Sequence, residues 1–381
     1  MTHIGIDIEQ FVRDTYGSGI QRVLQYLAKH WPSDVMTADF VVPMDRGYGL
    51  LTPEQAGELL SIPFAPRDGD ADLRELVRAH LAKLDVVTVK AGDLLAIYDA
   101  WLLPEVSYLP SVLERLELFH KCLPTMMIGY DTLPMSEPAN YRFKPGSSAW
   151  VSEYFRHLAT ADAVVCISDY SRDSILNRLR RDRSLPISVA HPGGDHLSSR
   201  IGLPPSRATF TRLGTMEARK HPVELLTAFV EAVSSHGAQA DLVFIGSPSA
   251  SDAAINGALL DAIEAGHPVR WVQGASDVEV HAAVQRSSAF LSVGTEGYGI
   301  PVLEAIRLGT PVLFDGVQPA AELMVGRGAR REPAMHHDDL VRMFIDYSIP
   351  GAMTSLAAQV APDRVPPWAS FARSVAASVP L

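Results

Sequence analysis

Residues 289–314 read AFLSVGTEGYGIPVLEAIRLGTPVLF, and this stretch predicts a complete βαβ unit. The apolar run from Ala289 to Val293 is typical of a buried strand. After a glycine-rich loop, Pro301 suits the first turn of a helix, because its missing N–H would have no partner there. Gly309 is expected to end that helix as a left-handed cap, and the apolar run from Pro311 to Phe314 predicts the next strand.

The loop of this unit is suited to binding an anion. Bare glycines let a ligand approach the backbone, and the N–H groups at the start of the following helix favour negative charge. Glu296 lies in the loop and Glu304 in the first turns of the helix. Carboxylates beside a phosphate are unfavourable unless they bind something else, such as sugar or ribose hydroxyls. The alternative is that Glu296 is a solvated loop residue and Glu304 a helix-start charge.

The two glutamates are separated by seven residues in the segment TEGYGIPVLEA. This spacing resembles the E-x7-E signature of the retaining GT-B glycosyltransferases of family 4, which reads E-G-F-G-L-P-x-x-E-A followed by G-x-P-V. The resemblance implies that Glu296 contacts the donor sugar and that Glu304 binds the nucleotide ribose. It also implies that loop amides meet the donor diphosphate, and these belong to Gly297, Tyr298, Gly299 and Ile300.

A second segment, GTMEARKHP, supplies two adjacent cations, Arg219 and Lys220. It follows a predicted strand, Thr209 to Leu213, and precedes a predicted helix. Cations at such a place can neutralise a departing diphosphate, although two solvated loop cations are the simpler reading of the segment by itself. The segment resembles the G-x-x-x-x-R-K of the same family, whose arginine and lysine grip the donor phosphates.

The N-terminal half carries a similar strand, glycine loop and helix. Ile4 to Ile8 predicts the strand, and the helix is marked by Ile20, Val23, Leu24 and Leu27. A glycine turn between a strand and a helix is common and by itself does not indicate a function. The segment GSGIQRV nevertheless resembles the G-G-I-x-R loop that faces the donor across the cleft in the family. That resemblance assigns a donor-side role to Gly19 and, more loosely, to Arg22.

Two more strands are predicted in this half, from Leu94 to Tyr98 and from Met126 to Tyr130. The second strand continues into GYDTLP, which resembles the family's H-D-x-x-P segment, where a polar pair reaches the sugar. Tyr130 stands where histidine is usual, so Asp131 is the candidate to position the sugar. The alternative is that Asp131 only caps the turn before Pro134.

Composition bounds the class of protein. The chain has 381 residues, which favours two domains, and it is 47% hydrophobic and 20% charged. Its 33 basic and 44 acidic residues give a net charge of −11, so a nucleic-acid partner is not expected. Two cysteines exclude a disulfide scaffold. No signal peptide and no apolar run of about 18 residues is apparent, so we expect a soluble, cytoplasmic protein.

Three weaker motifs have structural alternatives. Asp68 and Asp70 form a D-x-D that can hold a metal, but a Pro/Gly turn favours aspartate as a cap. The arginine-rich segment 172–183 is either a solvated helix or a helix in peripheral contact with the inner face of a membrane. His191 and His196 are interpreted as turn and surface residues, because no further metal ligands are spaced around them.

The alternation of strands and helices predicts two doubly wound, Rossmann-like α/β domains. With the resemblance, this becomes the GT-B fold. We expect an N-terminal acceptor-side domain over 1–200, a C-terminal nucleotide-sugar-binding domain over 208–360, and a terminal helix in 361–381 that crosses back to the N-terminal domain.

The function implied is a metal-independent hexosyltransferase of polysaccharide or glycoconjugate biosynthesis. It uses a nucleotide-diphosphate sugar as donor, a carbohydrate or lipid-linked acceptor, and no cofactor. The expected catalytic residues are Asp131, Arg219, Lys220 and Glu296. A GT-B sugar-nucleotide epimerase and a catalytically silent GT-B scaffold are the alternatives. The sequence does not indicate the donor nucleotide, the sugar, the acceptor or the oligomeric state.

Overall fold

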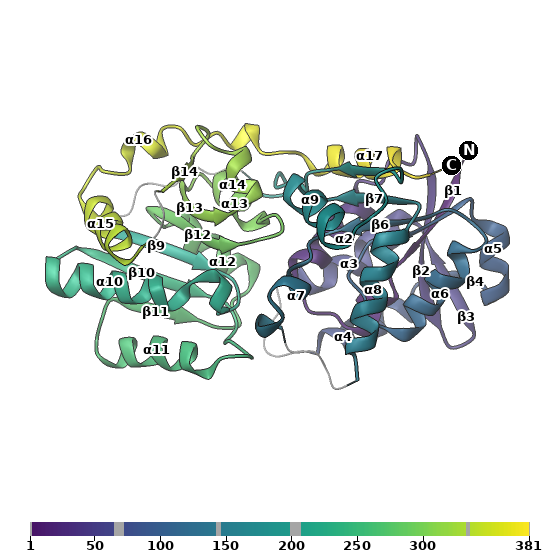
Figure 1. The fold of residues 1–381 in the computed structure, drawn as a ribbon, viewed down its shortest axis with the longest axis horizontal. Coiled ribbons are helices and arrows are strands. Elements are labelled where there is room, and N and C mark those ends of the chain that lie inside the picture. The colour runs from purple at the N-terminus through teal and green to yellow at the C-terminus, as the bar shows by residue number, and fades with distance from the viewer. Residues whose placement is uncertain (1, 65–71, 142–145, 199–206, 333–335, 381) are drawn as a thin grey trace. The chain divides into compact units, whose positions relative to one another are not determined.

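The computed structural model describes residues 2–64, 72–141, 146–198, 207–332 and 336–380. The chain forms two compact α/β units, each built on its own sheet (Figure 1). Unit 1 comprises Met1–Thr132, Phe143–Gly193 and Pro367–Leu381, and unit 2 comprises Leu133–Arg142 and Gly194–Pro366. The chain therefore passes between the units after Thr132, Arg142, Gly193 and Pro366.

Unit 1 contains an eight-stranded sheet in the order β4-β3-β2-β1-β5-β6-β7-β8. Its strands are β1 His3–Asp7, β2 Thr37–Met44, β3 Gly47–Leu51, β4 Val87–Val89, β5 Ala100–Leu103, β6 Thr125–Gly129, β7 Ala163–Cys166 and β8 Ile187–Val189. Its helices are α1 Glu9–Arg13, α2 Gly19–Lys29, α3 Pro53–Ser61, α4 Leu73–Leu81, α5 Leu94–Ile97, α6 Pro110–His120, α8 Ser148–Thr160, α9 Asp169–Arg178 and α17 Trp368–Ala377. Strands β3 and β4 run antiparallel to their neighbours, and the other pairs are parallel.

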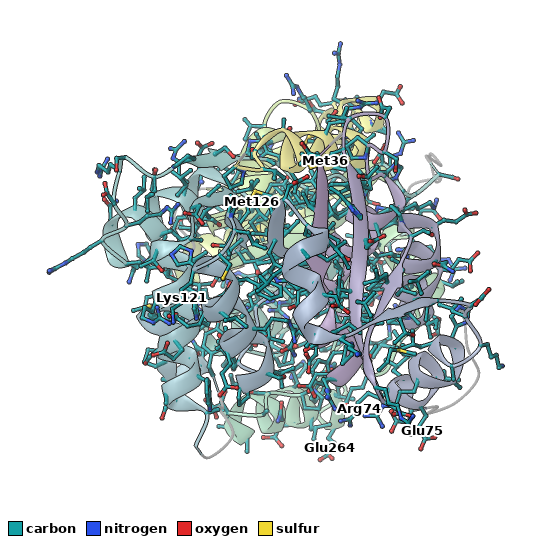
Figure 2. All side chains as sticks on the ribbon, turned by 90° about the vertical axis from the view of Figure 1, so that its right-hand side faces the viewer. Met36, Arg74, Glu75, Lys121, Met126 and Glu264 are labelled. Atoms are coloured by element: carbon teal, nitrogen blue, oxygen red, sulfur yellow. The ribbon has the colours of Figure 1, made fainter. Side chains whose placement is uncertain are left out.

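In unit 1, the apolar side chains of β6 are buried, whereas the charged side chain just after α6 is exposed. Met126 on β6 is 1% exposed, whereas the Lys121 side chain just after α6 is 64% exposed, and Figure 2 shows both. The terminal helix α17 packs on α2, where the rings of Trp368 and Tyr26 stack with their centroids 4.8 Å apart. Gly193 lies against the start of α17, since an added Cβ would come within 2.3 Å of the Trp368 nitrogen.

The predicted strand from Leu94 to Tyr98 is wrong, because Leu94–Ile97 form the short helix α5 instead. The Asp93 carboxylate accepts a hydrogen bond from the Lys90 N–H at 3.2 Å, which closes a 3₁₀ turn over Ala91–Asp93. That turn leads directly into α5, and strand β5 begins only at Ala100. A short apolar run does not distinguish a buried strand from a buried helical turn, and the cap decided between them.

Unit 2 contains a six-stranded parallel sheet in the order β11-β10-β9-β12-β13-β14. Its strands are β9 Ala208–Leu213, β10 Ala240–Ile245, β11 Val269–Val272, β12 Ala289–Thr295, β13 Val312–Val317 and β14 Ala329–Arg331. Its helices are α7 Leu133–Ser136, α10 Pro222–His236, α11 Ala253–Glu264, α12 Asp277–Gln285, α13 Ile300–Arg307, α14 Pro319–Leu323, α15 His337–Ser348 and α16 Thr354–Ala357. The predicted βαβ unit is confirmed as β12, α13 and β13, with Gly309 at a φ of +88° after the helix.

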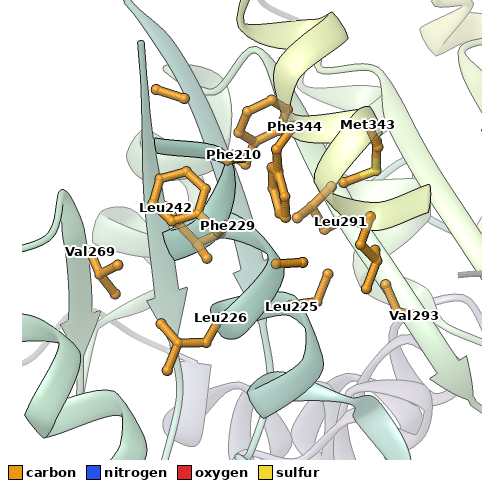
Figure 3. Close-up of a cluster of buried hydrophobic side chains, with 14 of the residues drawn as sticks. Phe210, Leu225, Leu226, Phe229, Leu242, Val269, Leu291, Val293, Met343 and Phe344 are labelled. Atoms are coloured by element: carbon orange, nitrogen blue, oxygen red, sulfur yellow. The ribbon is translucent and has the colours of Figure 1, made fainter. Parts of the chain in front are cut away.

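Aromatic side chains fill the core of unit 2 between the sheet and the helices α10 and α15 (Figure 3). Phe344 of α15 meets Phe210 of β9 and Phe229 of α10 edge-on, with ring centroids 5.1 and 5.2 Å away. Edge-to-face contacts add about 0.5–1.5 kcal/mol each beyond the area they bury. This core fixes β9, whose carboxyl end leads into the loop with the two predicted cations.

The strand order of both sheets creates a topological switch point. In unit 1, β1 lies between β2 and β5, and in unit 2, β9 lies between β10 and β12. Open α/β sheets bind ligands outside the carboxyl ends of the strands at such a point. The doubly wound α/β prediction is confirmed in both halves. No helix within the described ranges is long and apolar enough to cross a membrane.

Candidate functional site

The loops that follow β9 and β12 meet at the switch point of unit 2. Gly294, near the end of β12, has a φ of +96°, and a Cβ there would lie 1.9 Å from the Arg219 carbonyl oxygen. Gly316 on β13 is packed in the same way, with its Cβ position 2.3 Å from the Gly294 carbonyl oxygen. Only glycine permits this backbone conformation and this approach. The close packing holds the short 3₁₀ turn Ala218–Lys220 against β12.

This packing brings three of the predicted site residues together. The Lys220 Nζ lies 2.8 Å from Glu296 Oε1, and the Arg219 Nη1 lies 3.5 Å from Glu296 Oε2. Arg219 also pairs with Glu217 at 2.7 Å and donates to the Thr295 carbonyl oxygen. The three side chains remain partly accessible, with 11% of Arg219, 14% of Lys220 and 26% of Glu296 exposed. The cluster is thus fixed in place but still open to a ligand.

The electrostatics of the cluster are those of a carboxylate kept ionised by cations. Burial raises the pKa of Glu296, but Lys220 and Arg219 outweigh burial, so the pKa lies below its usual value. Arg212 on β9 was missed by the sequence reading. It is 2% exposed and donates to the Gly214 carbonyl oxygen at 2.9 Å. Burial lowers its pKa to about 10, and Glu296 opposes that effect.

The charge within a buried strand, ATFTRL, was the signal that could have identified Arg212. Arginine is almost never fully buried unless its charge is paired or hydrogen-bonded, so a cation in such a run indicates a structural role. Here it binds the first carbonyl of the loop that carries Arg219, so it fixes the loop from beneath.

The glycine loop between β12 and α13 is held from one side by Gln318. This side chain, 1% exposed, donates to the Gly294 carbonyl oxygen at 3.1 Å and accepts from Ser292 at 2.8 Å. Tyr298 and Ile300 are 3% and 8% exposed, so their side chains belong to the core. The predicted ligand contacts of this loop therefore rest on its backbone, at a helix start whose first N–H groups have no intrahelical acceptor.

Glu304 lies on the buried side of α13 and pairs with His196. The His196 Nε2 is 3.1 Å from Glu304 Oε1, and the two side chains are 3% and 9% exposed. The interpretation of His196 as a surface residue is wrong. Residues just after Gly193 pack along α13, where Arg307 donates to the Leu197 carbonyl oxygen at 2.8 Å. That approach buries the histidine, and spacing gave no signal for it.

In unit 1, Gly19 is the first residue of α2 and remains open. A Cβ added there would have nothing within 4 Å. The preceding loop is closed by Gln21, whose Oε1 accepts from the Tyr16 and Gly17 N–H groups at 2.9 Å, while its Nε2 donates to Asp14. Arg22 covers the ring of Phe64, with 4.5 Å from its Cζ to the ring centroid.

Tyr130, at the position where the resembled family has histidine, turns away from solvent. It is 4% exposed, and its hydroxyl donates to the Pro104 carbonyl oxygen at 2.8 Å. Burial, with help from Glu105, raises the pKa of Tyr130 well above its ordinary value. Asp131, the next residue, is partly exposed. The pKa of Tyr108 is raised mainly by burial and further by the charge of Asp131. Of this pair, Asp131 is the residue accessible to a ligand.

The switch point of unit 1 is filled by a buried ionic network that the sequence did not reveal. The Arg115 Nη2 lies 2.6 Å from Asp7 Oδ2 and 2.9 Å from Glu9 Oε2, and all three side chains are at most 7% exposed. Glu105, after β5, is also buried, and its Oε2 has no hydrogen-bond partner among the described residues. Burial raises the pKa of Glu105 to about 8, and the charge of Asp7 adds to that rise.

Two further motifs are the arginine-rich segment 172–183 and the D-x-D of Asp68 and Asp70. Ile175 of the basic helix α9 is fully buried in the core of unit 1, and Arg181 beyond it is buried and donates to the Pro186 carbonyl oxygen at 3.0 Å. Arg181 is therefore neither a solvated nor a membrane-facing cation. Asp68 and Asp70 lie outside the described residues. Among the residues that are described, no group of three or more His, Cys, Asp or Glu is arranged to hold a metal ion.

Residues 196–327 match the model of a protein family described as glycosyl transferases group 1. This range contains His196, Arg219, Lys220, Glu296 and Glu304. Among curated proteins, no sequence matches the chain.

Solved structures are similar to this chain over nearly its whole length. The lipopolysaccharide outer core galactosyltransferase WaaB in its apo form is 16% identical over 99% of both chains, with a TM-score of 0.59. HepE of Anabaena in complex with UDP and glucose is 14% identical over 99% of both chains, with a TM-score of 0.64. A putative UDP-N-acetylglucosamine 2-epimerase from Listeria monocytogenes is 12% identical over 99% of this chain and 95% of its own, with a TM-score of 0.52. These likenesses establish the two-unit GT-B fold.

Proposed function

We propose that this chain is a retaining glycosyltransferase of the E-x7-E type, family 4, that transfers a hexose from a nucleotide diphosphate to an acceptor hydroxyl. One observation carries the proposal. Arg219 and Lys220 are held beside Glu296 at the switch point of unit 2, within the range that matches glycosyl transferases group 1. The similarity to HepE, which was solved with UDP and glucose, supports a nucleotide sugar as donor.

The two cations act on the leaving group. Negative charge develops on the diphosphate as the bond to the sugar breaks, and preorganised donors at that place stabilise the transition state. Arg219 and Lys220 stabilise that negative charge together with the backbone N–H groups of residues 297–300. Because the two side chains supply positive charge, the proposal requires no metal. The loop glycines allow the diphosphate to reach the backbone.

The glutamates serve hydroxyl groups. Glu296 is ionised, so it accepts hydrogen bonds from the donor sugar while its cations turn to the phosphates. Glu304, oriented by His196, binds the ribose hydroxyls. We assign no carboxylate as a nucleophile and favour attack on the face that the diphosphate leaves, with a phosphate oxygen as the base. The roles of Gly19 and Asp131, which belong to unit 1, remain predictions.

Two other functions use the same fold. The similarity to a putative epimerase means that the fold alone does not select transfer. An epimerase would convert the donor to an isomer in the absence of any acceptor, and a silent scaffold would turn over nothing. Intact Glu296, Glu304, Arg219 and Lys220 favour a working donor site over a scaffold. The pathway we propose is polysaccharide or glycoconjugate synthesis in the cytoplasm or at the inner membrane face.

The test begins with the donor. UDP-, GDP- and dTDP-sugars are added to the purified protein, and a rise in the melting temperature identifies the nucleotide that the native state binds. Transfer and hydrolysis of that donor are then measured for the wild type and for Arg219→Ala and Lys220→Ala. Each substitution is expected to lower transfer by roughly 2–4 kcal/mol of transition-state stabilisation, or about 30- to 10³-fold.

The matched control is Lys121→Ala, which removes an exposed lysine paired with Glu117 at 3.1 Å in the other unit (Figure 2). It should leave transfer unchanged, because a surface pair contributes at most about 1 kcal/mol to stability. Near-normal transfer by both site variants would refute the assignment. Conversion of the donor to an isomer without an acceptor would establish the epimerase instead.

A further inference from the structure

Unit 1 contains an open cavity of about 680 Å³ that none of the residues discussed so far explains. Val12, Met44 and Leu81 contribute apolar surface to it, and they come from α1, β2 and α4. Ligand sites commonly have volumes of roughly 300–1,000 Å³, with mostly apolar walls and a few convergent polar groups. The cavity has the size and the walls of a binding site for a small molecule.

Three arginines line this cavity, and each comes from a different segment. Arg13 ends α1, Arg46 lies in the turn between β2 and β3, and Arg78 lies in the last turn of α4. Among the described residues that line the cavity, Asp45 is the one carboxylate. In a protein with a net charge of −11, this is a local excess of positive charge. Such an excess lets an anion approach a surface that repels it elsewhere.

The arginines differ in how far they are already paired. Arg13 Nε lies 3.3 Å from Glu9 Oε1, and the side chain is 54% exposed. Arg46 and Arg78 are exposed, and neither forms an ion pair with a residue of the described ranges. A guanidinium without a carboxylate partner keeps its fork of N–H donors for a ligand. A carboxylate or a phosphate monoester fits that fork with two parallel hydrogen bonds.

The position of the cavity in the sheet supports a substrate. Strand β2 ends at Met44, and α1 follows directly from the end of β1, so the cavity lies at the carboxyl end of β2, the strand next to β1. That is the edge at which open α/β sheets bind ligands. The residues proposed to bind the donor lie mainly in unit 2, so this second cationic site is available for another substrate.

We propose that the cavity, here called the arginine pocket, binds an acidic group on the acceptor through Arg46 and Arg78, with Arg13 as the third cation. This inference rests on the proposed glycosyltransferase function, since it names the acceptor class of that reaction. The chemistry recognised is a carboxylate or phosphate attached to a sugar. The apolar walls formed by Val12 and Leu81 take the carbon face of the ring.

The experiment uses pairs of ligands that differ only in the acidic group. Phenyl glucuronide is compared with phenyl glucoside, and glucose 6-phosphate with glucose. Melting shifts are measured with the donor nucleotide present at saturating concentration, so that Arg219 and Lys220 are occupied. The acidic member of at least one pair should raise the melting temperature, whereas its neutral partner should not. The responding pair identifies the acidic group as carboxylate or phosphate.

The variants are Arg46→Gln, Arg78→Gln and the double substitution. Each single change should weaken binding of the acidic ligand at least fivefold, and the double change should abolish its melting shift. Where an acidic acceptor supports transfer, its KM should rise at least tenfold in the double variant. The control is Arg74→Gln, one turn earlier on α4, because Arg74 points outward with Glu75 and lies 3.8 Å from Asp72 (Figure 2). This control should keep the full melting shift.

Equal responses to acidic and neutral ligands would overturn the proposal, and so would a melting shift that survives the double substitution. A failure of the proposed function has a different signature. In that case no pair would support transfer, while the acidic ligand would still bind and would still depend on Arg46 and Arg78. The pocket and the reaction are thus tested separately.

Discussion

The two sheets have the same kind of switch point, at β1 in unit 1 and at β9 in unit 2, but they fill it in opposite ways. In unit 1, Arg115 is enclosed by Asp7 and Glu9, and the network is sealed from solvent. In unit 2, the cations Arg219 and Lys220 meet Glu296 in a cluster that stays partly open. One crevice is closed by its own charges, whereas the other holds charges that a ligand can recruit.

The difference shows why topology alone does not identify an active site. Burying an ion pair costs desolvation energy, and removal of one partner then leaves an uncompensated charge. A sealed network therefore acts on stability, while an open cluster can exchange internal partners for a ligand. The two crevices should respond to mutation in different measurements.

Arg115→Met is expected to have the largest effect on folding. It leaves Asp7 and Glu9 buried without their cation, which should lower the free energy of unfolding by about 3–5 kcal/mol. Urea denaturation measures this loss. Arg156→Met is the control, because Arg156 pairs with Glu117 and Glu153 on the surface and should cost no more than about 1 kcal/mol. Equal losses in the two variants would remove the distinction between sealed and exposed pairs.

Glu105→Gln should change how stability depends on pH. The pKa of Glu105 is about 8 in the folded protein, against 4.5 for an ordinary glutamate. The folded state therefore binds an extra proton between these values, and stability falls as the pH rises through this window, by at most about 1.4 kcal/mol per pH unit. The variant should lose this fall, while Glu114→Gln, at an exposed position of α6, should retain it.

Glu296 should give the opposite dependence. Its pKa is lowered, so its contribution to stability is present above pH 4.5 and is lost as the pH falls below that value. Denaturation curves of Glu105→Gln and Glu296→Gln, collected across both windows, compare the two crevices directly. A fall in stability between pH 4.5 and 8 that persists in Glu105→Gln would contradict the assignment.

The smallest effect is expected for His196, which acts through Glu304. His196→Ala removes a buried hydrogen bond to a carboxylate, so nucleotide binding should weaken about tenfold, equivalent to about 1.4 kcal/mol. His196→Gln retains a donor and should recover part of the affinity. Calorimetric titration with the donor nucleotide measures both variants. If His196→Ala binds the nucleotide as the wild type does, the histidine does not orient Glu304 for binding.

Local patterns predicted much of the fold and some of the site. The βαβ unit over 289–314 was predicted because apolar periodicity, Pro301 and Gly309 all favour the same local conformations. Arg219, Lys220 and Glu296 were named from motifs, and the structure brings them together. The strand predicted from Leu94 to Tyr98 was wrong because a single cap before it outweighed its apolar character.

Tertiary structure alone decided what each crevice holds. Asp7 and Arg115 are 108 residues apart, and so are His196 and Glu304, so no local pattern relates them. The arginine pocket likewise joins three segments, because α1 packs on both α4 and β2. The sequence by itself determined the strands, the glycine loops and the charges at the strand ends, because these depend on neighbouring residues. Which charges are sealed and which remain open depended on how distant segments pack, since burial sets the energy of a charge.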